Sequence, residues 1–197
     1  NPRQGAPVRN QLSSDNSICQ QILTMASKMK TLQCDFVQTK QMSLLKDKQI
    51  SRGRLYYITP DRLRWEYTSP YASLLVMNGQ DVLMSDSRGS RVIDTRHNRM
   101  YREMTRLFAA SLSGQIFGDE SQFSVSVVQS EGEWIATLIP RRKSLRQMFT
   151  RIVIHFSVGQ CVASKVELEE PKGDHTAIEI TSVKQDVPLA NHLFKVK

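Results

Sequence analysis

The chain has 197 residues, of which 40% are hydrophobic and 23% are charged, and its formal net charge is +8. These values fit one soluble globular domain and exclude a disordered or fibrous protein. A chain of this length can bury enough surface to fold without a disulfide or a metal. Its apolar runs are much shorter than the ~18 residues of a membrane-spanning helix, so we expect no membrane span. The positive charge is compatible with an anionic partner, an anionic membrane surface or solubility alone.

The three cysteines are Cys19, Cys34 and Cys161. None belongs to a Cys-x-x-Cys pair, which leaves a zinc ribbon or a thioredoxin-type site without support. Cys34 and Cys161 lie in stretches of alternating apolar residues, where a cysteine is most often a small buried hydrophobe. One disulfide with a spare thiol is also compatible with this count. The sequence begins at Asn1 rather than at a methionine, so we expect a mature or trimmed form without its signal peptide.

Two helices are predicted from apolar spacing. Residues 1–14 are polar, contain two prolines and lack periodicity, which predicts a flexible N-terminal arm. From about residue 15, apolar residues recur at helical spacing between Ile18 and Met29, and Asp15 and the two serines before it are candidate N-caps. A second helix is predicted within residues 101–117, where Met104, Leu107 and Leu112 share one face and glycine follows.

Between and after these helices the apolar period is two, which is typical of β-strands. The clearest strand places Leu63, Trp65 and Tyr67 on one face and charged residues on the other. Asn78-Gly79 marks a hairpin turn because both residues tolerate a positive φ. The predicted strands cover residues 32–36, 55–57, 63–67, 74–77, 82–84, 123–128, 134–139, 149–156, 162–168 and 176–183. Many short strands separated by turns predict an antiparallel sheet, so residues 15–197 form one domain that is mainly β with a few helices (α+β).

Known catalytic motifs are largely missing from the sequence. G-x-S-x-G, Walker-type and H-E-x-x-H motifs are absent, and the four histidines have no metal-ligand spacing. We therefore expect no catalytic residue, no metal and no cofactor, and we keep a lipid hydrolase as an alternative. Basic residues concentrate in segments 88–106 and 141–146. These segments form either a solvated rim or a docking surface for an acidic protein or an anionic lipid surface. Nucleic-acid binding is not expected, because the aromatic residues lie on sheet faces that also carry aliphatic ones.

The sheet carries more bulky apolar side chains than two helices would be expected to cover. A sheet with an apolar face must cover that face or curl. If the sheet curls around helices that do not fill it, an apolar cavity remains, and if they fill it, the interior is a packed core. The periodicity alone leaves both outcomes open.

A family resemblance favours the cavity. The series Phe36-Val37-Gln38, Gly53-Arg54-Leu55, Leu63-Arg64-Trp65-Glu66-Tyr67, Asn78-Gly79 and Gly173-Asp174-His175-Thr176 resembles the periplasmic outer-membrane lipoprotein carrier family, LolA. The resemblance runs from about residue 15 to the end of the chain. It implies an incomplete antiparallel β-barrel, or curled sheet, in which helices act as a lid over an apolar cavity.

The resemblance also implies a function. Members of the family are not enzymes: they accept acylated lipoproteins from an inner-membrane exporter and deliver them through the periplasm to an outer-membrane receptor. We expect a monomer. The expected acyl cavity is formed by Leu55, Tyr57, Leu63, Trp65, Tyr67, Leu75, Met77 and Met84. The expected lid is formed by Leu107, Phe108, Leu112, Ile116 and Phe117.

One position departs from the family pattern. Family members usually carry an arginine immediately before the proline that corresponds to Pro60, and that arginine helps latch the lid. This chain has Thr59 at that position. The basic segment 88–106 has no counterpart in the resemblance. An envelope lipid or stress sensor, acting as a regulatory binding module on the same scaffold, is therefore the alternative function to the carrier.

Overall fold

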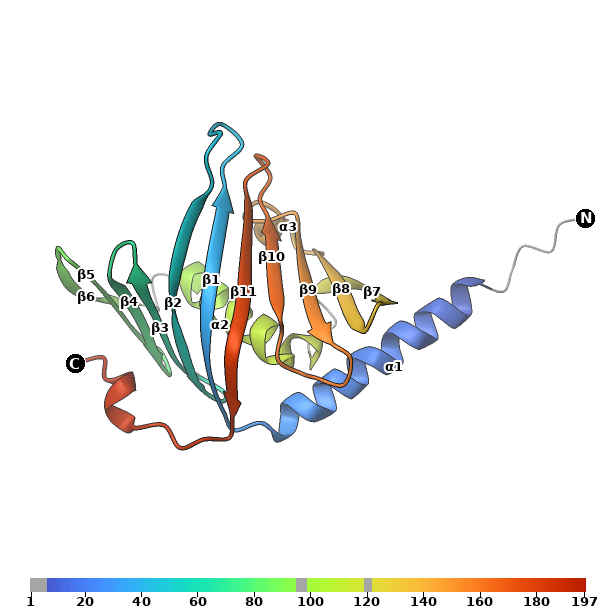
Figure 1. Ribbon diagram of the computed structural model, residues 1–197, viewed down its shortest axis with the longest axis horizontal. Helices are drawn as coiled ribbons and strands as arrows, with labels where there is room; N and C mark the ends of the chain where they lie inside the picture. Colours follow the sequence, from blue (N-terminus) through green and yellow to red (C-terminus); the bar gives the residue numbers. More distant parts are fainter. Residues whose placement is uncertain (1–6, 95–98, 119–121) are drawn as a thin grey trace, which may run out of the picture.

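The computed structural model describes residues 7–94, 99–118 and 122–197, and an eleven-stranded antiparallel sheet dominates it (Figure 1). The strands are β1 (Thr31–Gln41), β2 (Gln49–Ile58), β3 (Arg62–Ser69), β4 (Ser73–Asn78), β5 (Asp81–Asp86), β6 (Gly89–Asp94), β7 (Phe123–Ser130), β8 (Glu133–Pro140), β9 (Arg151–Ser157), β10 (Lys165–Glu169) and β11 (His175–Gln185). The helices are α1 (Pro7–Lys28), α2 (Arg99–Ser113) and α3 (Lys143–Arg146), with 3-10 turns η1 (Gln115–Gly118) and η2 (Asn191–Phe194).

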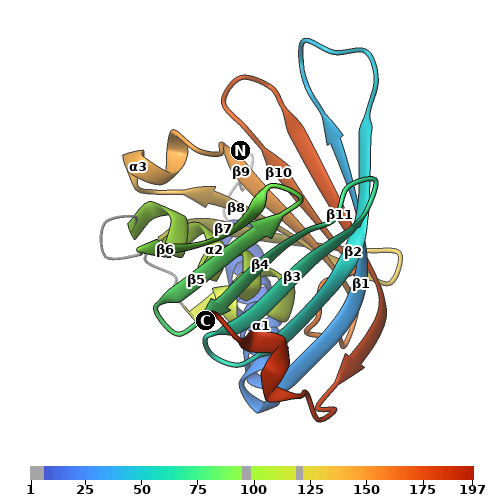
Figure 2. The same ribbon diagram turned by 90° about the vertical axis from the view of Figure 1, so that its left-hand side faces the viewer.

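The sheet curls without closing. Its spatial order is β6-β5-β4-β3-β2-β1-β11-β10-β9-β8-β7, and within the described chain the end strands β6 and β7 do not pair. Figure 2 shows the sheet bent around α2, with α1 behind β3 and β4 in this view. The predicted fold class is confirmed: the protein is mainly β with a few helices, and its antiparallel barrel is incomplete.

Helix α1 begins earlier than the sequence predicts. It starts at Pro7, so Asp15 lies inside the helix instead of capping it, and residues 7–14 are helical rather than a flexible arm. Proline suits the first turn of a helix because its fixed φ is helical and its missing N–H has no partner to lose there. The remainder of the predicted arm, residues 1–6, lies outside the described residues.

Three strand predictions also need correction. Strand β10 starts at Lys165 rather than at residue 162, because Ala163 N donates to the Leu112 carbonyl of α2 (2.9 Å) and so leaves the ladder. Strand β9 starts at Arg151 rather than at residue 149, since Phe149 N bonds the Leu145 carbonyl (3.1 Å). Strand β6 was not predicted because it is an exposed edge strand with little apolar alternation.

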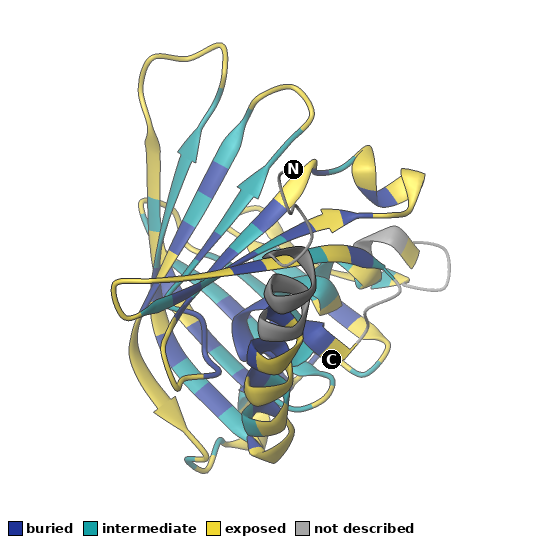
Figure 3. Ribbon diagram, turned by 90° about the vertical axis from the view of Figure 1, so that its right-hand side faces the viewer, coloured by how far each residue is buried: buried dark blue, intermediate teal, exposed yellow. Residues whose placement is uncertain are grey.

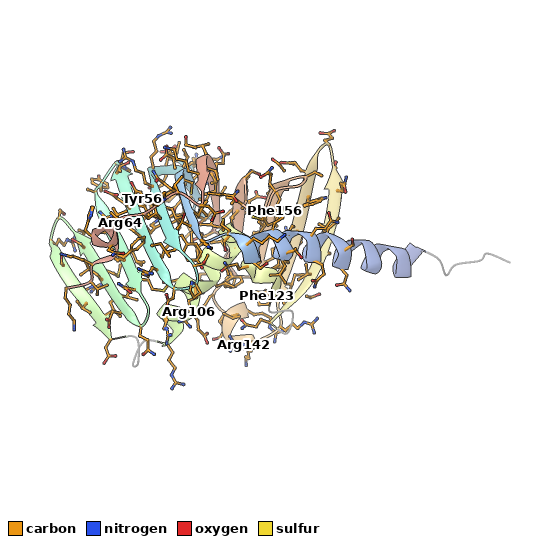
Figure 4. All side chains as sticks on the ribbon, turned by 90° about the horizontal axis from the view of Figure 1, so that it is seen from below. Tyr56, Arg64, Arg106, Phe123, Arg142 and Phe156 are labelled. Carbon is orange, nitrogen blue, oxygen red and sulfur yellow. The ribbon has the colours of Figure 1, made fainter. Side chains whose placement is uncertain are left out.

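The core has two parts. Buried residues alternate along the strands, and the larger cluster packs the concave face against α1, α2 and η1 (Figure 3). A smaller cluster lies on the convex face, where Phe194 and Val196 of the C-terminal segment cover Val76. Figure 4 shows Tyr56 and Arg64 together on that face, and Arg64 Nη1 donates to the Leu193 carbonyl (3.2 Å). Arg64 therefore faces outward as its strand parity predicts, but the C-terminal segment covers it in part.

The helix-to-turn boundary after α2 depends on one glycine. Gly114 has φ +78°, and a Cβ there would lie 2.7 Å from both the Cys161 carbonyl oxygen and Ile22 Cγ2. This close approach lets α1, η1 and the β9–β10 connection meet below the concave face.

The three cysteines are buried and none is in a disulfide, so the disulfide that the count allowed is absent from the structure.

Candidate binding cavity

A cavity of about 810 Å³ lies between the concave face of the sheet and α2. Its apolar wall comes from β3, β4 and β5 on one side, from β9, β10 and β11 on the other, and from α2 across the middle. The apolar lining residues are Leu63, Trp65, Tyr67, Leu74, Leu75, Met84, Met104, Leu107, Phe108, Ile152, Leu168 and Ile178. A mostly apolar hollow of this size, with a few polar groups, is typical of small-molecule sites.

Aromatic side chains build the β3 wall. Trp65 stacks on Phe36 of β1 with 4.0 Å between ring centroids, and Phe108 of α2 meets Trp65 edge-on at 4.8 Å. Tyr67 packs edge-on against Phe36 at 5.4 Å, and its hydroxyl donates to Gln38 Oε1 (2.7 Å). Burial raises the pKa of Tyr67, so the phenol stays protonated as a donor. The wall is thus one connected aromatic surface whose single hydroxyl is already hydrogen-bonded.

Helix α2 covers this surface. It is amphipathic, with Met104, Leu107 and Phe108 facing the cavity. Ser111 also lines the cavity, but its hydroxyl donates to the Leu107 carbonyl of the same helix (2.9 Å), which removes a polar group from the lining. Helix α2 also contacts the connection between β8 and α3 through the exposed pair Glu103–Arg142 (3.5 Å), a weak link. The cover therefore presents apolar groups to the cavity, and this exposed pair adds little to its attachment.

The turn that follows α2 has a firmer connection to the sheet. Tyr57 of β2 is buried, and its hydroxyl lies 3.1 Å from both Gln115 Oε1 of η1 and the Pro60 carbonyl. Burial, reinforced by the charge of Asp61, raises the pKa of Tyr57 to about 12, although Arg106 acts in the opposite direction. Tyr57 therefore stays protonated and joins the sheet to the turn that follows α2.

Thr59 stands where the resemblance implies an arginine, and its hydrogen bonds lead to the connection between α1 and β1. Its hydroxyl lies 3.3 Å from the Met29 carbonyl and 3.2 Å from the Lys30 carbonyl, and its N–H donates to the same Lys30 carbonyl (3.0 Å). These bonds fasten the end of β2 to the α1–β1 connection. The hydroxyl of Thr59 is thus engaged away from α2.

The sequence-predicted residues divide into two groups. The residues that line the cavity are Leu63, Trp65, Tyr67, Leu75, Met84, Leu107 and Phe108. The residues that instead pack in the core outside the lining are Leu55, Tyr57, Met77, Leu112, Ile116 and Phe117. Sequence reasoning missed lining residues on β1, β9, β10 and β11, among them Gln38, Lys40 and Ile178. For Gln38 and Lys40, the strand parity that follows from Phe36 could have found them.

The rest of the described chain offers little for metal or membrane chemistry. Across residues 7–94, 99–118 and 122–197, no three or more His, Cys, Asp or Glu residues come close enough together to hold a metal ion. In the same ranges no helix combines the length and apolar character needed to cross a membrane. The nearest approach to a cluster is Glu167, which contacts His155 (2.7 Å) and His175 (3.4 Å) on the sheet. The cavity is therefore the best candidate for a functional site.

Comparison with known sequences decides the family. Residues 27–197 match the family described as "Outer membrane lipoprotein carrier protein LolA". The chain belongs to the LolA family. The outer-membrane lipoprotein carrier protein of Cupriavidus taiwanensis is 26% identical over 183 residues, covering 89% of this chain and 81% of that protein. The protein of the same name from Coxiella burnetii (strain CbuK_Q154) is 26% identical over 190 residues, covering 94% and 85%.

Solved structures agree on the fold. The Pseudomonas aeruginosa MucA/MucB complex contains a chain that matches with a TM-score of 0.54 at 14% identity, covering 93% of this LolA-family chain and 61% of that one. A DUF1329 family protein from Desulfovibrio piger matches with a TM-score of 0.50 at 10% identity, covering 94% and 97%. At these identities the likeness shows the fold alone. This LolA-family chain spans less than two thirds of the matched chain in the MucA/MucB complex.

Proposed function

We propose that this protein is a non-catalytic periplasmic carrier that holds the acyl chains of lipoproteins in its cavity and moves them from the inner to the outer membrane. The observation that supports this most is the apolar cavity of about 810 Å³ under α2 in a member of the LolA family. Its partners would be an inner-membrane exporter and an outer-membrane receptor. Relatives that are about a quarter identical carry the name of such a carrier.

The hydrophobic effect is sufficient for binding. Burying an acyl chain contributes roughly 0.8 kcal/mol per CH₂, so one long chain contributes on the order of 10 kcal/mol. Trp65, Leu75 and Ile178 supply apolar wall on opposite sides of the cavity. No precise polar contact is needed for this step, because the hydrophobic effect is not directional.

Release then depends on α2. In the structure the apolar face of α2 lies over the cavity, and Phe108 contacts Trp65. A cargo chain must displace these contacts, so the protein's own side chains compete with it and reduce its net affinity. The exposed Glu103–Arg142 contact opposes movement of α2 only weakly, whereas Tyr57 and Gln115 hold the turn beyond it. We infer that α2 moves while η1 stays in place.

Binding is tested with a neutral fluorescent acyl probe and one cavity variant. Leu75→Glu places a carboxylate on a half-buried cavity wall, and we expect the 1:1 probe binding of the wild type to fall at least about tenfold because a charge in an apolar site is costly. Val92→Glu is the matched control, because Val92 lies on the neighbouring edge of the sheet, is 51% exposed and is not in the lining. Leu63 and Trp65 are less suitable, since they are almost fully buried and a glutamate there would test folding.

Two results would contradict the cavity assignment: a wild-type protein that binds no acyl probe, or a Leu75→Glu variant that binds as well as Val92→Glu. The carrier role needs a further assay, in which the protein is incubated with inner-membrane vesicles that hold a labelled lipoprotein and its exporter. We expect a soluble 1:1 complex of the two proteins. Probe binding without any extraction of lipoprotein would leave the cavity assignment standing and refute the carrier role.

A further inference from the structure

The inner face of the sheet changes from apolar to polar along its length. On β1 the inward residues run from buried Phe36 through Gln38 to Lys40, and on β5 the run ends at Asp86 after Met84. On β11 the inward side chains change from Ile178 to Thr176 in the same direction. The polar ends of β1 and β11 lie side by side near the β1–β2 connection, at the upper end in Figure 1, and Lys40, Thr176 and Asp86 all line the same cavity. The cavity therefore has an apolar interior and a polar rim.

The charges on this rim are mostly positive. Lys40, Arg88 and Arg91 are among its lining residues, and Asp86 is the one acidic residue of the lining. One oxygen of the Asp86 carboxylate accepts the Arg88 backbone N–H (2.8 Å) and so shapes the β5–β6 turn. Outside the lining, Asp174 lies close enough to Lys40 for that charge to help lower its pKa, after the larger effect of the Ser43 N–H. The rim thus keeps a net positive charge in the described structure.

The position of Arg91 connects the charge to the apolar wall. Arg91 pairs with Met84 across β5 and β6, and its Nη2 lies 4.0 Å from Met84 Sδ. Among the described residues, neither Lys40, Arg88 nor Arg91 forms an ion pair. Guanidinium and ammonium groups beside a low-dielectric wall attract anions and form strong hydrogen bonds with them. A ligand whose chains lie against Met84 would place its first polar group beside Arg91.

We propose that the rim of Lys40, Arg88 and Arg91 is a subsite for an anionic phosphate group attached next to the acyl chains, so that the cavity prefers anionic lipids to neutral lipids of equal chain length. This rests on the proposed function to the extent that acyl chains occupy the cavity. It goes beyond that function because the triacylated end of a lipoprotein carries no such anion. The charged rim determines the preference for anionic lipids, and the apolar wall of the cavity determines the affinity for the acyl chains.

The test compares three competitors of a neutral fluorescent diacylglycerol probe. Phosphatidylglycerol and diacylglycerol with the same two ten-carbon chains are compared below their aggregation concentrations, and glycerol 3-phosphate serves as a source of phosphate without chains. We expect phosphatidylglycerol to displace the probe at a concentration on the order of tenfold lower than diacylglycerol does, because a charge-assisted hydrogen bond adds to chain burial. Glycerol 3-phosphate should not displace it.

The variants assign the preference to the rim. The double variant Lys40→Gln, Arg91→Gln should lose the preference for phosphatidylglycerol, so that phosphatidylglycerol and diacylglycerol displace the probe at the same concentration. The control Lys184→Gln, Lys195→Gln removes the same charge at exposed positions outside the lining, and it should keep the preference. Raising the salt concentration should reduce the preference in the wild type, because exposed charges are screened.

The proposal is overturned if the two lipids are equally potent on the wild type, if the double variant keeps the preference, or if glycerol 3-phosphate displaces the probe. Failure of the proposed function gives a different result, in which the wild type does not bind the diacylglycerol probe at all. Equal and measurable binding of both lipids would refute the anionic subsite and leave the acyl cavity standing. The outcomes for the rim and for the wall are therefore distinguishable.

Discussion

Affinity for acyl ligands should rise with chain length until the cavity is full. The perturbation is a series of phosphatidylglycerols that differ only in the length of their two equal chains. The cavity volume of about 810 Å³ corresponds to roughly 27 groups of about 30 Å³ each, the volume of a water molecule in the liquid. Since a methylene group is similar in size, the interior accommodates roughly 27 chain carbons, or about 13 in each of two chains.

The gain in affinity per added carbon follows from the same burial of methylene groups. Each buried CH₂ contributes about 0.8 kcal/mol, which is close to a fourfold change in Kd. Each step adds one CH₂ to both chains, so the gain per step is up to about 1.6 kcal/mol. Displacement of α2 side chains such as Phe108 adds a cost that is the same for every member of the series, so it changes the absolute affinity but not the slope.

Isothermal titration calorimetry measures this directly, with each lipid kept below its aggregation concentration. We expect a steep gain in affinity up to about 13 carbons per chain and a plateau beyond it. We also expect a negative heat-capacity change on binding, which is the signature of apolar burial. Affinity that is independent of chain length over the short members would refute the reasoning, because it would mean that the head group alone is bound.

Three further predictions concern stability and reactivity. Gly53→Ala should lower the free energy of unfolding by more than about 3 kcal/mol in urea titrations, because its Cβ would strike a backbone carbonyl of β3 and lie 2.5 Å from Phe36 Cζ; a loss below 1 kcal/mol would contradict the packing. The Cys34 thiol, whose pKa is raised to about 12 by burial and the nearby Asp35, should react with iodoacetamide at pH 8 only as fast as the protein unfolds, and rapid native labelling would contradict its burial. The pKa of Glu167 is lowered, because the His155 hydrogen bond and nearby positive charges outweigh the effect of burial. The carboxylate therefore stabilises the fold above the ordinary carboxyl pKa, and this stabilisation is lost as the pH falls through the pKa of the folded state. The difference in unfolding free energy between the wild type and Glu167→Gln should shrink on acidification, and a constant difference would contradict this.

Much of the fold could be predicted because its elements have strong local signals. The alternation of Leu63, Trp65 and Tyr67 with charged residues indicates which face of β3 is buried, and the structure agrees. The edge strand β6 lacks such a signal because both of its faces are largely exposed. The start of α1 at Pro7 could not be predicted from apolar spacing that begins at Ile18.

The depth of each residue in the cavity could not be predicted. Leu55 and Leu75 have the same apolar character and face the same side of the sheet, yet Leu75 lines the cavity and Leu55 lies in the core. The difference depends on which other elements pack over each residue, and a strand sequence contains no information about those distant contacts. Strand parity therefore predicts the inward face, while packing of other elements decides which part of that face stays open.

The most direct measurement of the central claim uses the two tryptophans of the chain. Trp65 lines the cavity, whereas Trp134 is buried on β8 outside it and donates through Nε1 to Gln129 Oε1 (3.2 Å). Bromine quenches tryptophan fluorescence at contact, so an acyl lipid brominated in mid-chain should quench the Trp134→Phe variant strongly and saturably at 1:1, and should leave Trp65→Phe almost unquenched. Equal quenching of both variants, or none in Trp134→Phe despite binding, would place the chain elsewhere and contradict the account.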